Sequence, residues 1–283
     1  MRINHNIPSM VTQGALFKVN GNLNTSLERL STGLRINRAS DDAAGLGVSE
    51  NLRTQVRGTG QAIRNAQDGI AAITIAEGAA NEVSALLQRM RELAIQSSND
   101  TLTSTERAYT DAEFQHLDQE IDRIAAVTNY NDMDLLSTDA NRFGYATSAD
   151  DGSVLWVDAN NVVGTDSITI SIDTLTSTSL SVDTLTLTQQ TSSVNAVSTL
   201  DQAISSVNSM RADMGAYVNR LEHAINNLTV SNTNQQAAES LIRDVDFAAE
   251  TTQFTRNQIL NQSGMAMLSQ ANIVPQSVLQ LLG

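Results

Sequence analysis

Apolar side chains recur at steps of three and four residues over most of the chain, and this spacing predicts long amphipathic helices. The most regular ladder lies toward the C-terminal end, interrupted only by Arg211. Its members are Val197, Leu200, Ile204, Val207, Met214, Val218, Leu221, Ile225 and Leu228. A coiled-coil seam of this kind needs a partner helix. The only two prolines are Pro8 and Pro275, so no proline interrupts the chain between them.

A second ladder, from about Ala43 to Ser98, can supply that partner. Its members are Ile63, Ala66, Ile70, Ile73, Ala76, Ala80, Val83, Leu87, Met90 and Ala94. A helix of about 56 residues would span roughly 84 Å, which far exceeds a typical globular helix. The segment 40–42, Ser-Asp-Asp, offers N-cap side chains at its start. A shorter helix, predicted from Ser104 to about Thr128, can fold back on the long one.

The two ends of the chain carry further helical patterns. Residues 1–34 place Leu16 and four later leucines at helical spacing, and Gly33 then weakens the helix. Near the other end, helix is predicted from about Val194 to Val230. A polar stretch over 231–236 is expected to separate it from a last helical region over 237–271.

The middle of the chain, roughly 129–190, is different because Ser, Thr and Asp become frequent. Alternation of apolar and polar residues at 168–172, 180–182 and 185–187 predicts short strands. The predicted fold class is therefore mainly α: a long antiparallel helical bundle or coiled-coil rod formed by both chain ends, with a small central β-hairpin segment. We expect that central segment to lie toward the far tip of the rod.

Charge and composition narrow the functions that fit this fold. The net charge is −14, and residues 100–190 hold sixteen acidic and three basic side chains, which argues against nucleic-acid binding there. There is no cysteine, which excludes disulfides and thiolate metal sites. No apolar run approaches the length of a membrane span, so membrane insertion is not expected. The N-terminus lacks the pattern of a cleavable secretion signal, which favours a cytoplasmic protein or export by another route.

Signatures of catalysis are absent from the sequence: it contains no HExxH, P-loop, GxGxxG or GxSxG motif. His116 has Glu113 and Glu120 within a helical turn, but a solvated helix face explains it better than a metal site because no second histidine is near. A basic cluster at Arg29, Arg35 and Arg38 lacks interleaved aromatics, which favours contacts with acidic neighbours over nucleic acid. No catalytic residue, cofactor or metal ligand is predicted.

Two sets of motifs are more specific. Near the N-terminus the chain reads SLERLSTGLRIN at 26–37, DDAAG at 41–45, RNAQDGI at 64–70 and LQRMREL at 87–93. Near the C-terminus it reads IRDVDFA at 242–248, QAN at 270–272 and PQSVL at 275–279. These segments resemble bacterial flagellins over about 1–136 and 192–283. The central segment resembles nothing that we can name.

The resemblance implies a domain organisation. Residues 1–42 with 245–283 would form an inner coiled-coil domain, and residues 43–139 with 192–244 an outer helical domain. Residues 140–191 would form its variable, β-rich tip, which is too short for large outer domains. The resemblance also implies export through the flagellar secretion apparatus, followed by self-assembly into an extracellular filament for swimming motility. A flagellar export chaperone and a filament cap protein are the expected partners besides other copies of the chain.

Two sets of site residues follow from the resemblance. Assembly of the filament core is expected to use Leu23, Leu27, Leu30, Leu34, Phe247, Phe254, Ile259, Leu268, Val278, Leu279 and Leu282. Contact with the vertebrate Toll-like receptor for flagellin is expected at Leu87, Gln88, Arg89, Leu93 and Glu113. Arg89 would supply a charge-assisted contact and Leu93 an adjacent apolar one. All five could equally be packing residues or filament contacts, and both roles can hold at once.

Two other functions are alternatives. A hook–filament junction protein has similar termini, but the 87–93 stretch and the Pro275 motif favour flagellin. An enzyme inserted into the middle is the alternative from another class. It would have only about 60 residues, with no histidine between His116 and His223.

Overall fold

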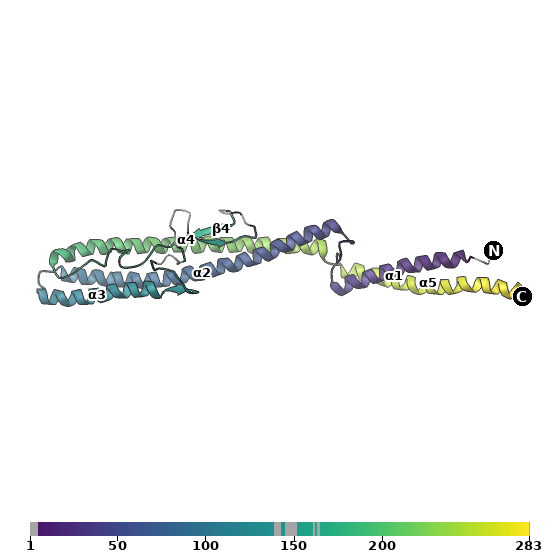
Figure 1. The fold of residues 1–283 in the computed structure, drawn as a ribbon, viewed down its shortest axis with the longest axis horizontal. Helices are drawn as coiled ribbons and strands as arrows, with labels where there is room; N and C mark the ends of the chain where they lie inside the picture. Colours follow the sequence, from purple (N-terminus) through teal and green to yellow (C-terminus); the bar gives the residue numbers. More distant parts are fainter. Residues whose placement is uncertain (1–4, 139–142, 145–151, 161, 163–164, 283) are drawn as a thin grey trace. The chain divides into compact units, whose positions relative to one another are not determined.

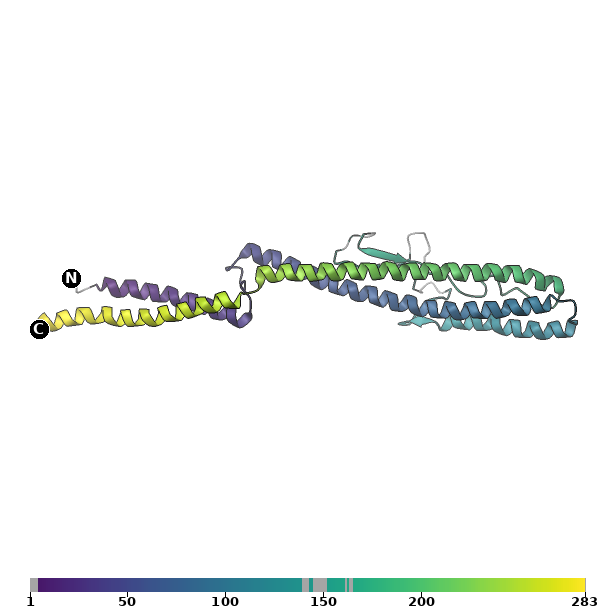
Figure 2. The ribbon, with the colours of Figure 1, turned by 180° about the vertical axis from the view of Figure 1, so that it is seen from behind.

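A computed structural model describes the chain except residues 1–4, 139–142, 145–151, 161, 163–164 and 283, and describes no side chain beyond residue 273. Its helices are α1 (Ile7–Thr32), α2 (Ala43–Ser97), α3 (Ser104–Val127), α4 (Gln190–Arg243) and α5 (Phe247–Leu282). Its strands are β1 (Asn129–Tyr130), β2 (Met133–Asp134), β3 (Ser153–Trp156) and β4 (Ser167–Ile170). The predicted fold class is confirmed: long antiparallel helices from both chain ends, with small β hairpins between them (Figures 1 and 2).

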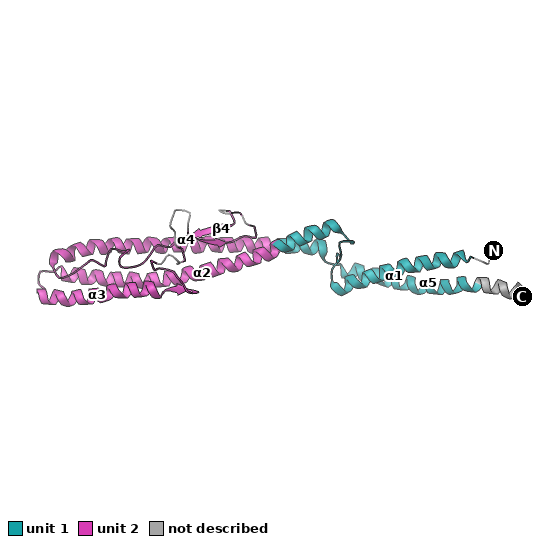
Figure 3. Cartoon of the chain, viewed as in Figure 1, with its two compact units in different colours: residues 1–54, 233–283 teal, residues 55–232 magenta. Residues whose placement is uncertain are grey.

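The chain forms two compact units (Figure 3). One unit contains residues 1–54 and 233–283, and the other contains residues 55–232. We call them the terminal unit and the central unit. The boundaries between the two units fall inside the helices α2 and α4.

In the terminal unit, α1 and α5 pair in opposite directions. Asn6 caps α1 by accepting a hydrogen bond from the Ser9 amide at 3.2 Å. Gly33 ends the helix with a φ of 73°, a left-handed conformation that glycine adopts without strain. Asp246 then starts α5, because its Oδ1 atom accepts from the amides of Ala248 and Ala249 at 2.9 and 3.2 Å.

The central unit is built on α2 and α4, which lie side by side in opposite directions with α3 folded back on α2 (Figures 1 and 2). The predicted seams form its core. Along α2 the fully buried members include Ala66, Ile73, Ala76, Ala80, Val83, Leu87, Met90 and Ala94. Along α4 they include Leu200, Val207, Met214 and Leu221. Met210 is buried as well, and Arg211, which interrupted the ladder, reaches Glu77 of α2 at 3.9 Å.

The break predicted at 231–236 is wrong, because α4 continues through it to Arg243. Asn232 shows why a polar stretch can stay helical here. Its Nδ2 atom donates to the carbonyl oxygen of Val56 at 2.8 Å and lies 2.7 Å from Oγ1 of Thr59. Asn232 thus binds the neighbouring helix, and the actual break comes at 244–246, where Asp246 caps the next helix.

The strand predicted at 168–172 is confirmed in part by β4, which pairs antiparallel with β3 so that Ser153 lies opposite Ile170. The strands predicted at 180–182 and 185–187 are absent, although Leu180, Val182 and Leu187 are buried as their alternation implied. The segment instead follows α3 as a strap, held by polar contacts instead of a strand ladder. We use the name strap for residues 171–189.

The expectation that the central segment lies at the tip of the helices is wrong for the hairpin. The β3–β4 hairpin lies along α2, where Asn65 donates to the carbonyl oxygen of Trp156 at 3.2 Å and Ala159 lies against Gly58. The cause is α3: the chain folds back at Ser97–Ser104 and leaves the helix 24 residues later, roughly 36 Å from that turn. The strap then returns the chain to the start of α4.

One part of α2 is more apolar than expected, because the sequence analysis predicted no apolar run near the length of a membrane span. An 18-residue window within Ala43–Ser97 is apolar enough to cross a membrane by length and composition. The same helix carries the seam of the central unit, whose residues from Ala66 to Ala94 are buried against other helices. Core packing therefore accounts for its hydropathy.

Candidate functional site

The α1–α5 pair carries a regular seam of inward-facing positions. Alternating steps of three and four residues mark the less exposed side of each helix. On α1 they are Ser9, Thr12, Leu16, Val19, Leu23, Ser26 and Leu30. On α5 they are Glu250, Phe254, Asn257, Asn261, Gly264, Leu268 and Ala271. Polar and small residues fill about half of these positions, so the pair buries little apolar surface of its own.

Large apolar side chains lie instead on the outside of this pair. Phe17 is 83% exposed and Leu27 is 46% exposed. Others with large exposed fractions on α1 and α5 are Ile7, Met10, Val11, Phe247, Ile259, Leu260, Met265, Met267 and Ile273. Exposed apolar surface on this scale, concentrated on one pair of helices, is typical of an interaction surface.

The expected assembly residues divide between the seam and this outer surface. Leu23, Leu30, Phe254 and Leu268 lie in the seam and are half-buried, as is Leu34 just beyond α1. The exposed members are Leu27, Phe247 and Ile259. Val278, Leu279 and Leu282 lie outside the residues whose side chains are described.

Sequence reasoning missed most of the outer surface. The leucine ladder marks only one face of α1, and Ile7, Met10, Val11 and Phe17 do not belong to it. Their spacing is a second helical stripe, and two apolar stripes on a helix with a single partner would have indicated the exposed one.

The loop between α1 and α2 is tied to the loop between α4 and α5. The Arg35 amide donates to the carbonyl oxygen of Arg243 at 2.7 Å, and the Val245 amide donates to that of Gly33 at 3.0 Å. Arg243 in turn forms an ion pair with Glu50 of α2 at 2.7 Å. These bonds connect both chain ends within the terminal unit.

The expected receptor residues do not share one surface. Gln88, Arg89 and Glu113 are exposed, and Arg89 forms an ion pair with Glu113 of α3 at 2.8 Å. Leu87 and Leu93 are 0% and 1% exposed. The expectation that Leu93 offers an apolar surface contact beside Arg89 is therefore wrong for this chain, because the side chain is packed in the core of the central unit.

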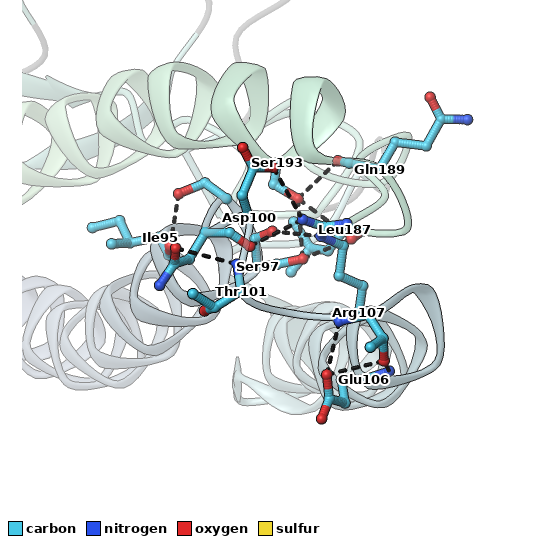
Figure 4. Close-up of polar contacts among 12 residues, drawn as sticks. Ile95, Ser97, Asp100, Thr101, Glu106, Arg107, Leu187, Gln189 and Ser193 are labelled. Atoms are coloured by element: carbon cyan, nitrogen blue, oxygen red, sulfur yellow. Dashed lines mark hydrogen bonds and ion pairs between the residues drawn. The ribbon is translucent and has the colours of Figure 1, made fainter.

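A polar cluster closes the end of the central unit where α2 ends and α3 and α4 begin (Figure 4). The Ser97 hydroxyl donates to the carbonyl oxygen of Leu187 at 2.7 Å, and Ser193 of α4 lies 3.1 Å from the same hydroxyl. Arg107 of α3 donates to the carbonyl oxygens of Ser97 and Asn99 at 3.0 and 2.9 Å. Arg107 thus caps the C-terminal end of α2 at the carbonyl oxygen of Ser97, and it shares the carbonyl oxygen of Asn99 with the Leu102 amide, which donates to it at 3.3 Å.

The strap is fixed to α3 by carboxylates. Asp122 accepts from the amide and the hydroxyl of Ser177, both at 2.8 Å, and Asp111 accepts from the Leu187 amide at 2.6 Å. Burial raises the pKa of Asp118, with the charges of Asp122 and Asp183 adding to the effect, to about 6. This is a packing interface, and within the described residues no group of three or more His, Cys, Asp or Glu side chains could hold a metal ion.

The sequence and the structure of the chain are similar to those of known proteins. Two family models match: the bacterial flagellin N-terminal helical region over residues 3–141, and the bacterial flagellin C-terminal helical region over residues 197–282. A flagellin of Halalkalibacterium halodurans is 45% identical over 285 residues, covering 100% of both chains. The flagellar filament 33 kDa core protein of Treponema phagedenis is 44% identical over 288 residues, with the same coverage. A crystal structure of Bacillus cereus flagellin is 32% identical, with a TM-score of 0.48, and spans 62% of this chain and 94% of its own.

Proposed function

The chain belongs to the bacterial flagellin family, and we propose that the outer apolar surface of α1 and α5 is where its copies pack together. The protein is a structural subunit that self-assembles into the flagellar filament. The single observation that carries the proposed surface is the exposure of large apolar side chains on α1 and α5, Phe17 foremost at 83%. Nothing in the comparisons favours a hook–filament junction protein.

Burial of this surface supplies the driving force for assembly. Each large apolar side chain removed from water contributes on the order of 1.5–3 kcal/mol. Since the α1–α5 seam is half polar, the pair gains little from its own packing, and contacts with neighbouring copies would stabilise it further. A contact between two different surfaces that does not close on itself gives an open helical polymer instead of a ring.

The small number of apolar contacts between α1 and α5 also suits export. We propose that the chain leaves the cell through the flagellar secretion apparatus, accompanied by an export chaperone, and is added beneath a filament cap. A helix pair with few apolar contacts opens at low cost in free energy, and a chain without cysteine cannot cross-link on the way. The protein would then reside in the extracellular filament.

Seeded polymerisation tests the proposed surface. Removal of residues 245–283 should leave a soluble monomer that does not polymerise. A sharper variant is Phe17→Asp, with Gln13→Asp as its control, because Gln13 is an exposed polar residue of the same helix. We expect Phe17→Asp to lower the polymer yield in sedimentation and electron microscopy at least tenfold, and Gln13→Asp to leave it near that of the unaltered chain. Normal filaments from Phe17→Asp would reject the surface.

A second proposal concerns a host partner, the vertebrate Toll-like receptor for flagellin. Its support is the exposed trio of Gln88, Arg89 and Glu113, in which Glu92 at 3.0 Å and Glu113 both hold the Arg89 guanidinium in place. An arginine fixed in this way loses little side-chain entropy on binding.

Receptor signalling by the monomer tests this patch. Arg89→Asp should lower signalling at least tenfold. Arg123→Asp is the matched control, because Arg123 is an exposed arginine of α3 paired with Glu120 at 2.6 Å. If the Arg89 and Arg123 variants signal as strongly as the unaltered chain, the patch is not the receptor contact.

A further inference from the structure

We propose that Met10, Met265 and Met267 make assembly sensitive to oxidation. A peroxide converts these side chains to methionine sulfoxides in the free subunit, and the oxidised subunit no longer joins a filament. The proposal rests on the proposed function, because it assigns a modification site to the outer apolar surface of α1 and α5. The reactant is hydrogen peroxide or another oxidant that transfers one oxygen atom.

These three methionines are open to solvent in a single copy of the chain. Met10 is 64% exposed, Met265 59% and Met267 61%. Their exposure does not require α1 and α5 to be paired, because separating the two helices uncovers the side chains further. All three belong to the exposed apolar residues that we propose as the packing surface between copies. An oxidant can therefore reach them before assembly.

The methionines of the central unit are less accessible. Met90, Met210 and Met214 are buried in its hydrophobic core. Met133 of β2 is half-buried. Because an oxidant must touch the sulfur atom to react with it, packing protects the three buried side chains. Reactive and protected methionines thus lie in different units of one chain.

The two methionines of α5 lie on different flanks of the α1–α5 seam. Met265 and Met267 are two residues apart, which is about 200° around a helix. On its flank, Met267 lines a groove with Val11 and Leu260. A subunit of a helical polymer has neighbours on more than one side. Sulfoxides at these two positions would therefore face neighbouring copies on both flanks.

The reaction needs no group besides the thioether and the peroxide. The sulfur atom attacks one oxygen of hydrogen peroxide, an S–O bond forms and the O–O bond breaks. The sulfur is oxidised by two electrons, and the second oxygen leaves as water after taking the proton of the first. The chain has no cysteine, so no thiol competes for the oxidant. The product is a polar side chain where a flexible apolar one had been.

The sulfoxide oxygen opposes assembly because it is a hydrogen-bond acceptor. In the free subunit this oxygen is bound to water, so oxidation leaves the subunit soluble. Packing it against apolar side chains of another copy removes that water and offers no donor in return, which is unfavourable. Subunits that are already packed are protected, because their sulfur atoms are covered. Methionine sulfoxide reductases reverse the modification, so the block is reversible.

Peptide mass spectrometry tests the accessibility of each methionine during treatment of the full-length chain with hydrogen peroxide. In the monomer, we expect the three exposed methionines to be oxidised at least tenfold faster than the three buried ones. In filaments of the unaltered chain, the same three should react at least tenfold more slowly than in the monomer. Equal rates for the two groups in the monomer, or unchanged rates in filaments, would overturn the proposal.

Seeded polymerisation tests the consequence. Complete oxidation of the exposed methionines should lower the polymer yield at least tenfold, and methionine sulfoxide reductases with dithiothreitol should restore it. The triple variant Met10→Leu, Met265→Leu, Met267→Leu keeps the apolar volume without the sulfur atoms, so it should polymerise equally well before and after peroxide. Met133→Leu is the control, because it removes a sulfur atom from the central unit. It should stay as sensitive to peroxide as the unaltered chain.

The polymer yields separate this proposal from the proposed function. A normal yield from the unaltered chain both before and after complete oxidation defeats the proposal and leaves the proposed function standing. A triple variant that loses polymerisation on treatment with peroxide also defeats it, because another side chain would then be responsible. Absence of filaments from the untreated, unaltered chain defeats the proposed function instead.

Discussion

Leu155 of β3 packs onto α2 at Gly69, where an added Cβ atom would overlap its Cδ1 atom. The hairpin also approaches α2 at Gly58, where a Cβ atom would come within 2.7 Å of the Cβ atom of Ala159. The two glycines are eleven residues apart, which is about three helical turns, so they lie on the same side of α2. Two small residues on that side are therefore what lets the hairpin lie flat on the helix.

We predict that Gly69→Ala displaces the hairpin and lowers the free energy of unfolding of the central unit by about 1–3 kcal/mol, the usual cost of overpacking. Trp156 is the only tryptophan in the chain and lies in β3, so its fluorescence reports hairpin docking. Gly78→Ala is the control, because nothing lies within 4 Å of an added Cβ atom there. It should leave the fluorescence unchanged and stabilise the helix by up to about 1 kcal/mol. Identical behaviour of the two variants would contradict the close approach at Gly69.

The α2–α4 seam gives a second prediction. Val207 is fully buried and Ile204 is half-buried, one turn apart on α4. Val207→Asp would bury a carboxylate without a partner and should destabilise the central unit by more than about 3 kcal/mol. Ile204→Asp should cost less, because its carboxylate can reach water at the edge of the seam. Chemical denaturation of the monomer measures both, and an unchanged midpoint for Val207→Asp would show that the seam is wrong.

The long helices could be predicted from the sequence because the spacing of their apolar residues and their capping residues indicate helix over the same segments. Asp42, for example, caps α2 as the Ser-Asp-Asp segment suggested, accepting from the Gly45 amide at 2.8 Å. The strap could not be predicted in the same way. Its alternation correctly marked Leu180, Val182 and Leu187 as buried, but burial of alternate residues does not require a strand partner. Carboxylates of α3 bind the strap backbone where a strand ladder was expected.

The candidate site was predictable only in part for a similar reason. Periodicity identifies an apolar face but does not say whether the same chain or another copy covers it. Leu23 and Leu27 belong to one leucine ladder, yet Leu23 lies in the α1–α5 seam and Leu27 is 46% exposed. Leu93 illustrates the converse, since a motif placed it in a surface contact and three-dimensional packing placed it in the core.

Arg107 provides a third prediction, at the end of the central unit. Its side chain is 14% exposed and donates to two carbonyl oxygens at the end of α2 (Figure 4). Arg107→Ala should lower the free energy of unfolding by about 1–3 kcal/mol, because it removes the side-chain donor from both oxygens and leaves the Asn99 oxygen with the Leu102 amide alone. Arg107→Lys keeps the charge but not the forked geometry, so it should restore less than half of the loss. Full restoration by lysine would mean that charge alone matters at this position.

Asp118 gives the last prediction, on pH. The pKa of its carboxyl is raised from 3.8 to about 6 in the folded chain, first by burial and then by the negative charges of Asp122 and Asp183. Because the folded state holds this proton more tightly than the unfolded state, the contribution to stability is full below pH 4. It is lost as the pH rises from about 4 to 6.

Asp118→Asn removes the titrating group and keeps the shape of the side chain. We expect the variant to match the unaltered chain near pH 4 and to be more stable at pH 7, on the order of 1 kcal/mol after allowance for partial solvent screening. Urea denaturation at both pH values measures the difference in stability between the variant and the unaltered chain. Carboxylates whose pKa values are lowered, such as Glu106, are present in both chains, so their contributions cancel in this difference. Val127→Asn, at an exposed position of the same helix, is a control that should show no such pH dependence. An Asp118→Asn variant that is less stable than the unaltered chain at pH 7 would show that the charged form of this carboxyl stabilises the strap.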